Sequence, residues 1–228
     1  MSTEQDLCGL LRRQAEVTPD KLFLRFSDGD STYREFRDAV ETRAGALKRA
    51  LGDVLIPGSP GDEANPVVLP ALLPNCREAV ELWFAASRLG WTWAPINTEF
   101  RGRGLSHAIN LTRSPVLIVD EALLSNVLNV LDELDHLTTL VIRGSAATTP
   151  PSAAARLRSI ELDRLRPAPD RVGPAPTAPE RTALLLYTSG TTGPSKACRL
   201  STRYVEGQGA LMARCLGIEA SDVLFCPY

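Results

Sequence analysis

Short apolar segments alternate with longer amphipathic segments through the first 143 residues, and this alternation constrains the fold more than any other feature. The apolar segments have the length of strands and lie at Trp91–Ile96, Val116–Val119 and Leu140–Ile142. The segments between them have helical periodicity and lie at Glu78–Leu89, Arg103–Thr112 and Glu121–Leu131. Strands that are apolar on both faces and separated by helices form mostly parallel sheets covered on each side. The pattern therefore predicts an α/β fold.

The N-terminal part begins with a predicted strand at Leu22–Phe26 and a turn at Ser27–Ser31. Thr32 and Glu35 form a capping box at the start of a long amphipathic helix. Pro66 and Pro70 weaken the prediction of a strand at Val67–Leu73, because proline cannot donate a backbone hydrogen bond to a neighbouring strand.

Composition divides the chain into three parts, which we expect to be an N-terminal α/β portion (1–143), a connector (144–182) and a terminal segment (183–228). Of the 17 prolines, 7 lie in the connector, which otherwise lacks sustained periodicity. Only Ile160–Leu165 has enough apolar content to dock onto the rest of the chain.

Charge and composition exclude several functions. The 228 residues carry a net charge of −2 with no dominant basic cluster, which argues against nucleic-acid binding. The polar start and the absence of any membrane-length apolar run predict a cytoplasmic protein without an integral membrane segment. The five cysteines have no metal-binding spacing, so we expect reduced thiols, several of them in the core. His107 and His136 lie in predicted helices without other ligands nearby, so no metal site is expected.

The strongest functional signal is a loop that follows the apolar run Ala183–Tyr187. It combines hydroxyl side chains with glycines, whose backbone N–H groups can approach an anion, and it ends in a lysine. It fits neither a Walker A loop nor a Gly-x-Ser-x-Gly nucleophile elbow. An ordinary surface turn is the alternative interpretation. The candidate phosphate-binding residues are Thr188, Ser189, Gly190, Thr191, Thr192, Gly193 and Lys196.

The loop, Tyr-Thr-Ser-Gly-Thr-Thr-Gly-Pro-Ser-Lys, resembles the signature of the AMP-forming adenylating enzymes, which include acyl-CoA synthetases, luciferase and peptide-synthetase adenylation domains. Leu73-Pro74-Asn75 and the stretch from Pro95 through Arg101-Gly102 resemble the same superfamily. The sequence around Ile96-Asn97-Thr98, together with His107 further along the chain, is most similar to fatty acid transport proteins and carnitine-CoA-ligase-like acyl-CoA synthetases.

This resemblance implies the first part of the large N-terminal domain of an ATP-dependent acid–CoA ligase. Such an enzyme joins a carboxylic acid, here a fatty or carnitine-like acid, to AMP with release of pyrophosphate and then transfers the acyl group to coenzyme A. The implied cofactor is ATP with Mg²⁺, and the candidate loop residues would hold the β- and γ-phosphates of that ATP. Peripheral contact with a membrane is left open by the transport-protein likeness.

The resemblance also implies that the groups binding adenine, ribose and magnesium, together with the catalytic lysine, lie beyond Tyr228. No catalytic residue is therefore expected within the chain, and we expect the chain to be an inactive N-terminal part of the ligase. The alternative hypothesis is a non-catalytic remnant that binds a nucleotide or a partner.

Overall fold

The computed structural model describes residues 6–55, 66–145, 156–165, 173, 178–188 and 194–226. Its helices are α1 (Leu7–Val17), α2 (Tyr33–Leu51), α3 (Arg77–Leu89), α4 (Gly102–Leu111), α5 (Leu124–Leu128) and α7 (Thr202–Leu216). Its strands are β1 (Leu22–Phe26), β2 (Gly29–Thr32), β3 (Val68–Leu72), β4 (Thr92–Pro95), β5 (Val116–Asp120), β6 (Thr139–Arg143), β7 (Arg158–Glu161), β8 (Thr182–Thr188) and β9 (Lys196–Ser201).

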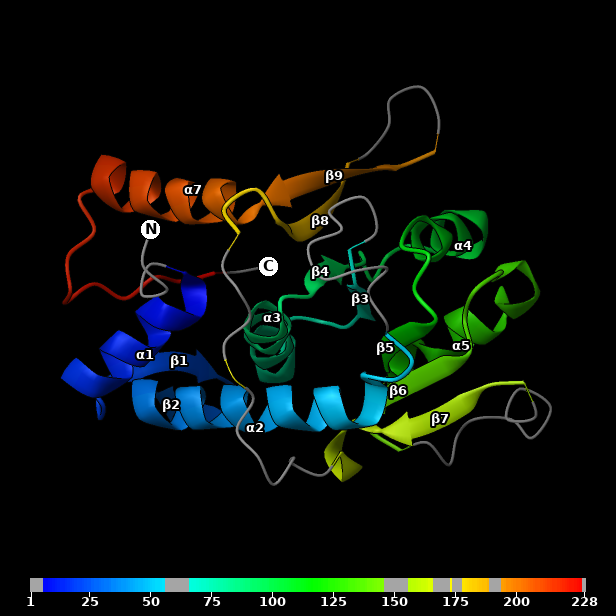
Figure 1. The fold of residues 1–228 in the computed structure, drawn as a ribbon, viewed down its shortest axis with the longest axis horizontal. Coiled ribbons are helices and arrows are strands. Elements are labelled where there is room, and N and C mark those ends of the chain that lie inside the picture. Colours follow the sequence, from blue (N-terminus) through cyan, green and yellow to red (C-terminus); the bar gives the residue numbers. More distant parts are fainter. Residues whose placement is uncertain are drawn as a thin grey trace.

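The main sheet has seven strands in the order β7-β6-β5-β3-β4-β8-β9. Every neighbouring pair from β7 to β8 is parallel, and only β9 runs antiparallel to its neighbour. Helices cover both faces, with α2 and α3 on one side and α4 and α5 on the other (Figure 1). The predicted α/β fold with a largely parallel sheet is confirmed.

Alternation along the central strands produces two separate cores. Val116 and Ile118 of β5 pack with α2 and α3, whereas Leu117 and Val119 pack with α4 and α5. All four side chains are fully buried. Because successive strand residues point to opposite faces, a continuous apolar run serves both cores at once.

The capping box is confirmed at the start of α2. The Glu35 backbone N–H donates to Thr32 Oγ1 at 3.3 Å, and the Thr32 N–H donates to Glu35 Oε2 at 2.8 Å. The segment before it differs from the prediction, because Gly29–Thr32 forms strand β2 of an antiparallel hairpin with β1. Gly29 has a φ of 137°, a conformation that favours glycine, and it permits the tight turn between the two strands.

The expectation of a continuous helix at 121–131 is wrong. The chain instead forms a 3-10 turn at Glu121–Leu123, the short α5 and a second 3-10 turn at Leu131–Glu133. Asp120 caps the first turn through a 3.0 Å hydrogen bond that its carboxylate accepts from the Ala122 N–H. The apolar residues still reach the core, and Leu124 and Val127 are buried.

Pro70 lies within an inner strand, so its predicted weakening of β3 is not observed. The carbonyls of Val67 and Ala71 accept from β4, which by alternation turns the nitrogen of Pro70 toward β5. Pairing between β3 and β5 begins only at Ala71 and Ile118. The missing N–H of Pro70 therefore falls just before that ladder starts.

Part of the proline-rich segment joins the sheet. Strand β7 pairs in parallel with β6, and the 3-10 turn Leu162–Arg164 follows it. Leu162 is fully buried against α2 and α3. The predicted docking of Ile160–Leu165 is confirmed, and strands from all three composition-defined parts share one sheet.

The cysteines depart from expectation, because Cys76 alone is buried. Cys8 is half-buried, and Cys198, Cys215 and Cys226 are exposed. The last three lie on β9, on α7 and after α7, at the end of the chain where α7 has no buried residue. Trp91 and Trp93, in contrast, are core residues.

Candidate functional site

The candidate loop connects the antiparallel strands β8 and β9. Thr188 ends β8, Lys196 begins β9, and the two residues are direct partners in the strand register. The hydroxyl of Thr188 donates to the carbonyl of Lys196 at 3.3 Å. Five of the predicted phosphate-binding residues, Ser189, Gly190, Thr191, Thr192 and Gly193, lie outside the described residues. The structure thus brings together the two outer members of the predicted set.

The two faces of this hairpin have different surroundings. Thr188 and Lys196 share one face and are exposed. Leu186, on the same face, is 41% exposed. The opposite face carries Tyr187 and Leu185, which pack toward the rest of the fold. Lys196 therefore lies on the exposed face of the hairpin, which we call its open face.

Helix α4 supports the covered side of the hairpin at both ends of the loop. The Tyr187 hydroxyl donates to the carbonyl of Ala108 at 2.8 Å, and its ring meets Phe100 edge to face with centroids 6.2 Å apart. Burial raises the pKa of the Tyr187 phenol, so it remains a neutral donor at physiological pH. His107 Nε2 lies 2.8 Å from the carbonyl oxygen of Ser195.

Sequence reasoning did not identify the contact of His107 with Ser195; it placed this histidine in a helix and expected no metal site there. The two residues are 88 positions apart, so no local pattern joins them. The nearest sequence signal is that both fall in segments resembling the same superfamily. Their proximity arises because the chain crosses between β4 and β5 through α4, directly beside the hairpin.

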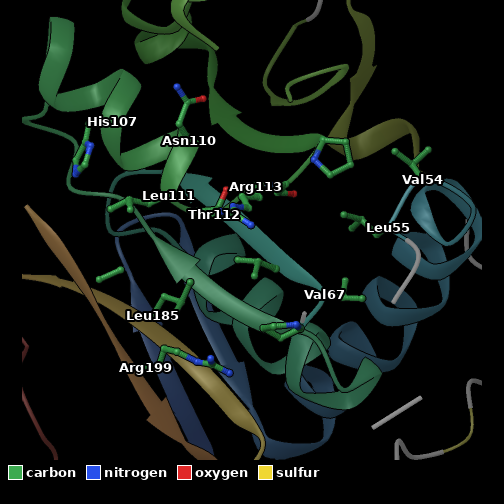
Figure 2. Close-up of a pocket in the computed structure, with 15 residues that line it drawn as sticks. Val54, Leu55, Val67, His107, Asn110, Leu111, Thr112, Arg113, Leu185 and Arg199 are labelled. Carbon is green, nitrogen blue, oxygen red and sulfur yellow. Dashed lines mark hydrogen bonds between the residues drawn. The ribbon is translucent and has the colours of Figure 1, made fainter. Parts of the chain in front are cut away.

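A cavity of about 700 Å³ lies beside the contacts between α4 and the hairpin (Figure 2). Its walls come from the covered face of the hairpin, the second half of α4, the segment between α4 and β5, the start of β3, and Val54 and Leu55 after α2. Arg199 lines it and donates to the Thr182 hydroxyl at 3.0 and 2.9 Å. Leu185, Ala197 and Arg199 line the cavity, and by strand alternation they lie on the hairpin face opposite Lys196. The cavity therefore lies on the other side of the hairpin from that lysine.

The charge of the hairpin suits an anion. From Thr182 to Ser201 the sequence contains Lys196 and Arg199 and no acidic residue. Among the described residues, no group of three or more histidine, cysteine or acidic side chains lies close enough to hold a metal ion. A hydroxyl, a mobile ammonium group and glycine-rich backbone are donors appropriate to phosphate oxygens.

Residues 11–228 match the family described as AMP-binding enzyme. The chain belongs to this family. Among its relatives, the chain is 29% identical over 218 residues to human long-chain fatty acid transport protein 5, covering 93% of this chain and 30% of that protein. It is 27% identical over 212 residues to the medium/long-chain-fatty-acid–CoA ligase FadD6 of Mycobacterium tuberculosis, covering 90% of this chain and 31% of the ligase.

A solved CoA synthetase shares the fold. The o-succinylbenzoate CoA synthetase MenE of Bacillus subtilis, solved with its acyl-adenylate intermediate, superposes with a TM-score of 0.68 at 21% identity over 95% of this chain and 48% of that one.

This chain spans about 30% of the length of the two curated relatives named above. In the part of the chain that the structure describes, no helix has the length and apolar character needed to span a membrane.

Proposed function

We propose that this chain provides the polyphosphate-binding part of an AMP-forming acid–CoA ligase. The observation that carries the proposal is the hairpin, in which Thr188 and Lys196 face each other across the two ends of a hydroxyl- and glycine-rich loop. Membership of the AMP-binding enzyme family supports the same role.

In this proposal the loop binds the β- and γ-phosphates of ATP. Thr191 and Thr192 would donate their hydroxyls, Gly190 and Gly193 would allow close approach of backbone N–H groups, and Lys196 would supply positive charge. Ser189 and Thr188 would complete the donor set. The contribution of these residues is to hold the leaving pyrophosphate and to stabilise its charge.

The reaction proposed for the whole enzyme has two steps. The carboxylate of the acid attacks the α-phosphorus of ATP, which forms acyl-AMP and releases pyrophosphate. The thiol sulfur of coenzyme A then attacks the acyl carbon, AMP leaves, and the thiol proton passes to solvent. The first step needs no general base, because the attacking carboxylate is already ionised.

The hairpin sequence from Thr182 to Ser201 offers no carboxylate side chain as a ligand for Mg²⁺. Magnesium prefers oxygen ligands and commonly binds through substrate phosphates. We therefore propose that Mg²⁺ reaches this hairpin on the phosphate oxygens of ATP. The acid substrate is proposed to be a fatty or carnitine-like acid, because relatives are named as fatty acid transport proteins and fatty-acid–CoA ligases. A cytoplasmic location is part of this proposal, whereas peripheral membrane contact stays open, as the transport-protein likeness leaves it.

The test is binding of Mg·ATP to the 228-residue chain by calorimetry. Lys196→Ala removes a charge-assisted contact of a kind that contributes about 1.5 to 3 kcal/mol, so affinity should fall about tenfold to a hundredfold. Lys48→Ala is the matched control, since Lys48 is an exposed lysine near the end of α2. Equal affinity of wild type and Lys196→Ala would rule out the phosphate role.

The alternative is a non-catalytic remnant that binds a nucleotide or a partner, and thioester formation by this chain would exclude it. The chain spans less than a third of the length of these relatives, so we expect it to bind nucleotide without forming acyl-CoA. Incubation with Mg·ATP, coenzyme A and acids from acetate to long-chain fatty acids should give no thioester above a Lys196→Ala control. Thioester formation would show that the site is self-contained.

A further inference from the structure

Two consecutive residues of α4 hold the two strand ends that border the candidate loop. The carbonyl of Ala108 accepts the hydroxyl of Tyr187, which precedes Thr188. His107 Nε2 contacts the carbonyl of Ser195, which precedes Lys196. Both heavy-atom distances are 2.8 Å. Figure 2 shows His107 on α4 at the side that faces the hairpin.

The chemistry of the second contact fixes the position of a proton. A carbonyl oxygen only accepts hydrogen bonds, so Nε2 of His107 must carry hydrogen. The contact acts as an anchor between α4 and the backbone just before β9.

The contact between His107 and Ser195 lies on the covered side of the hairpin, so it does not block the exposed face that carries Lys196. Tyr187 belongs to the face that packs on α4, and Lys196 begins on the opposite, open face. Fixing the carbonyl of Ser195 from the covered side sets the position and direction of the next residue.

We propose that His107 is a positioning residue that, through Ser195, fixes the point from which Lys196 reaches the phosphates of ATP. This role rests on the proposed function of the loop. Tyr187 and Ala108 form the matching anchor on β8, so that α4 sets the spacing between the two ends of the loop. Small displacements of a binding group weaken contacts with a ligand held elsewhere, which makes such an anchor functional as well as structural.

The experiment compares four variants of the 228-residue chain with inorganic pyrophosphate and Mg·ATP as calorimetric probes. His107→Leu removes the donor and keeps an apolar side chain, whereas His107→Gln restores an amide N–H at similar reach. Ser106→Ala is the matched control, because Ser106 donates to Glu133 Oε2 at 2.5 Å and so anchors α4 away from the hairpin. Lys196→Ala tests the loop itself.

We expect His107→Leu to weaken binding of both probes about threefold to tenfold, as the loss of one hydrogen bond implies. His107→Gln should return to within about twofold of wild type. Ser106→Ala should lower the melting temperature and leave both affinities unchanged. A purely structural role of His107 would lower the melting temperature in the same way, without the selective loss of affinity.

Amide hydrogen exchange gives a readout that needs no ligand. The backbone N–H of Lys196 should exchange faster in His107→Leu and at the wild-type rate in His107→Gln. Unchanged affinity and exchange in His107→Leu, beside weaker binding by Lys196→Ala, would overturn the positioning role and leave the proposed function intact. Wild-type affinity in Lys196→Ala, or no binding by wild type, would remove both.

Discussion

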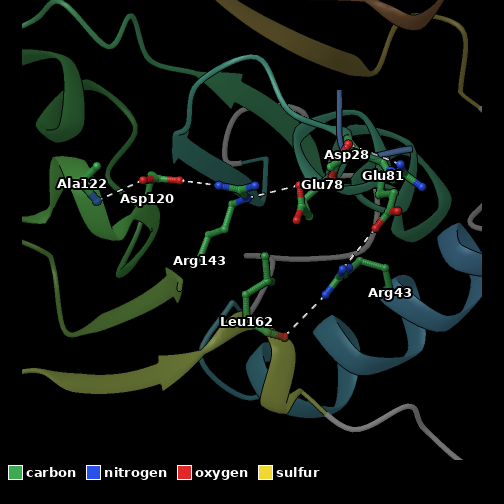
Figure 3. Close-up of polar contacts among 9 residues, drawn as sticks. Asp28, Arg43, Glu78, Glu81, Asp120, Ala122, Arg143 and Leu162 are labelled. Carbon is green, nitrogen blue, oxygen red and sulfur yellow. Dashed lines mark hydrogen bonds and ion pairs between the residues drawn. The ribbon is translucent and has the colours of Figure 1, made fainter. Parts of the chain in front are cut away.

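The ion pair between Arg43 of α2 and Glu81 of α3 allows a quantitative test of how the two helices are held on the sheet. Arg43 Nη2 lies 3.1 Å from Glu81 Oε2, and the two side chains are only 17% and 9% exposed. Arg43 Nη1 also donates to the carbonyl of Leu162 at 3.4 Å, which ties the turn after β7 to α2 (Figure 3). The pair thus joins three segments of one core.

Arg43→Met should leave the Glu81 carboxylate buried without its partner. Removing one member of a buried pair costs about 3 to 5 kcal/mol, and the residual exposure of Arg43 places the expected loss at about 3 kcal/mol. In Arg43→Met combined with Glu81→Leu, no buried charge remains and most of that loss should be recovered. Urea unfolding followed by tryptophan fluorescence measures both values.

The matched control is Arg37→Met on the same helix. Arg37 pairs with Asp38 at 2.7 Å, but their side chains are 31% and 62% exposed, so the change should stay within about 0.5 kcal/mol. Two results would refute the reasoning: a loss for Arg43→Met no larger than that of the control, or a double variant no more stable than Arg43→Met.

Three further predictions concern the cysteines and the exposed apolar side chains. Iodoacetamide at pH 7.5 should label the exposed Cys198, Cys215 and Cys226 before Cys8 and Cys76 in a peptide mass map, and early labelling of Cys8 would contradict the fold. Burial raises the pKa of Cys8 from 9.0 to about 12, so its contribution to stability is fully present below about pH 9 and is lost as pH rises toward 12. The chain should also bind a hydrophobic dye through Leu211, Leu216 and Phe225, which are 57%, 65% and 88% exposed. Leu211→Glu with Leu216→Glu should reduce the dye fluorescence, and unchanged fluorescence would place the dye elsewhere.

The sequence predicted the fold class because burial on both faces of a strand leaves a continuous apolar run. Val116–Val119 and Leu140–Ile142 showed this pattern, and both are inner strands of the sheet. The cap at Thr32 was also predictable, since it depends on residues three positions apart. Local rules misjudged Pro70, because whether a missing N–H matters depends on which neighbour the nitrogen faces.

For the candidate site, too, some features were predictable from the sequence and others depended on tertiary structure. The sequence alone identified a loop rich in hydroxyls and glycines ending at Lys196, because donors that bind one phosphate chain can be contiguous in sequence. Only the tertiary structure placed Thr188 opposite Lys196 and set His107 against Ser195, since strand register and the crossing of α4 depend on contacts between distant segments. The sequence thus determines which donor groups the loop carries. Their support from α4 depends on tertiary packing, because His107 and Ser195 are 88 positions apart in the chain.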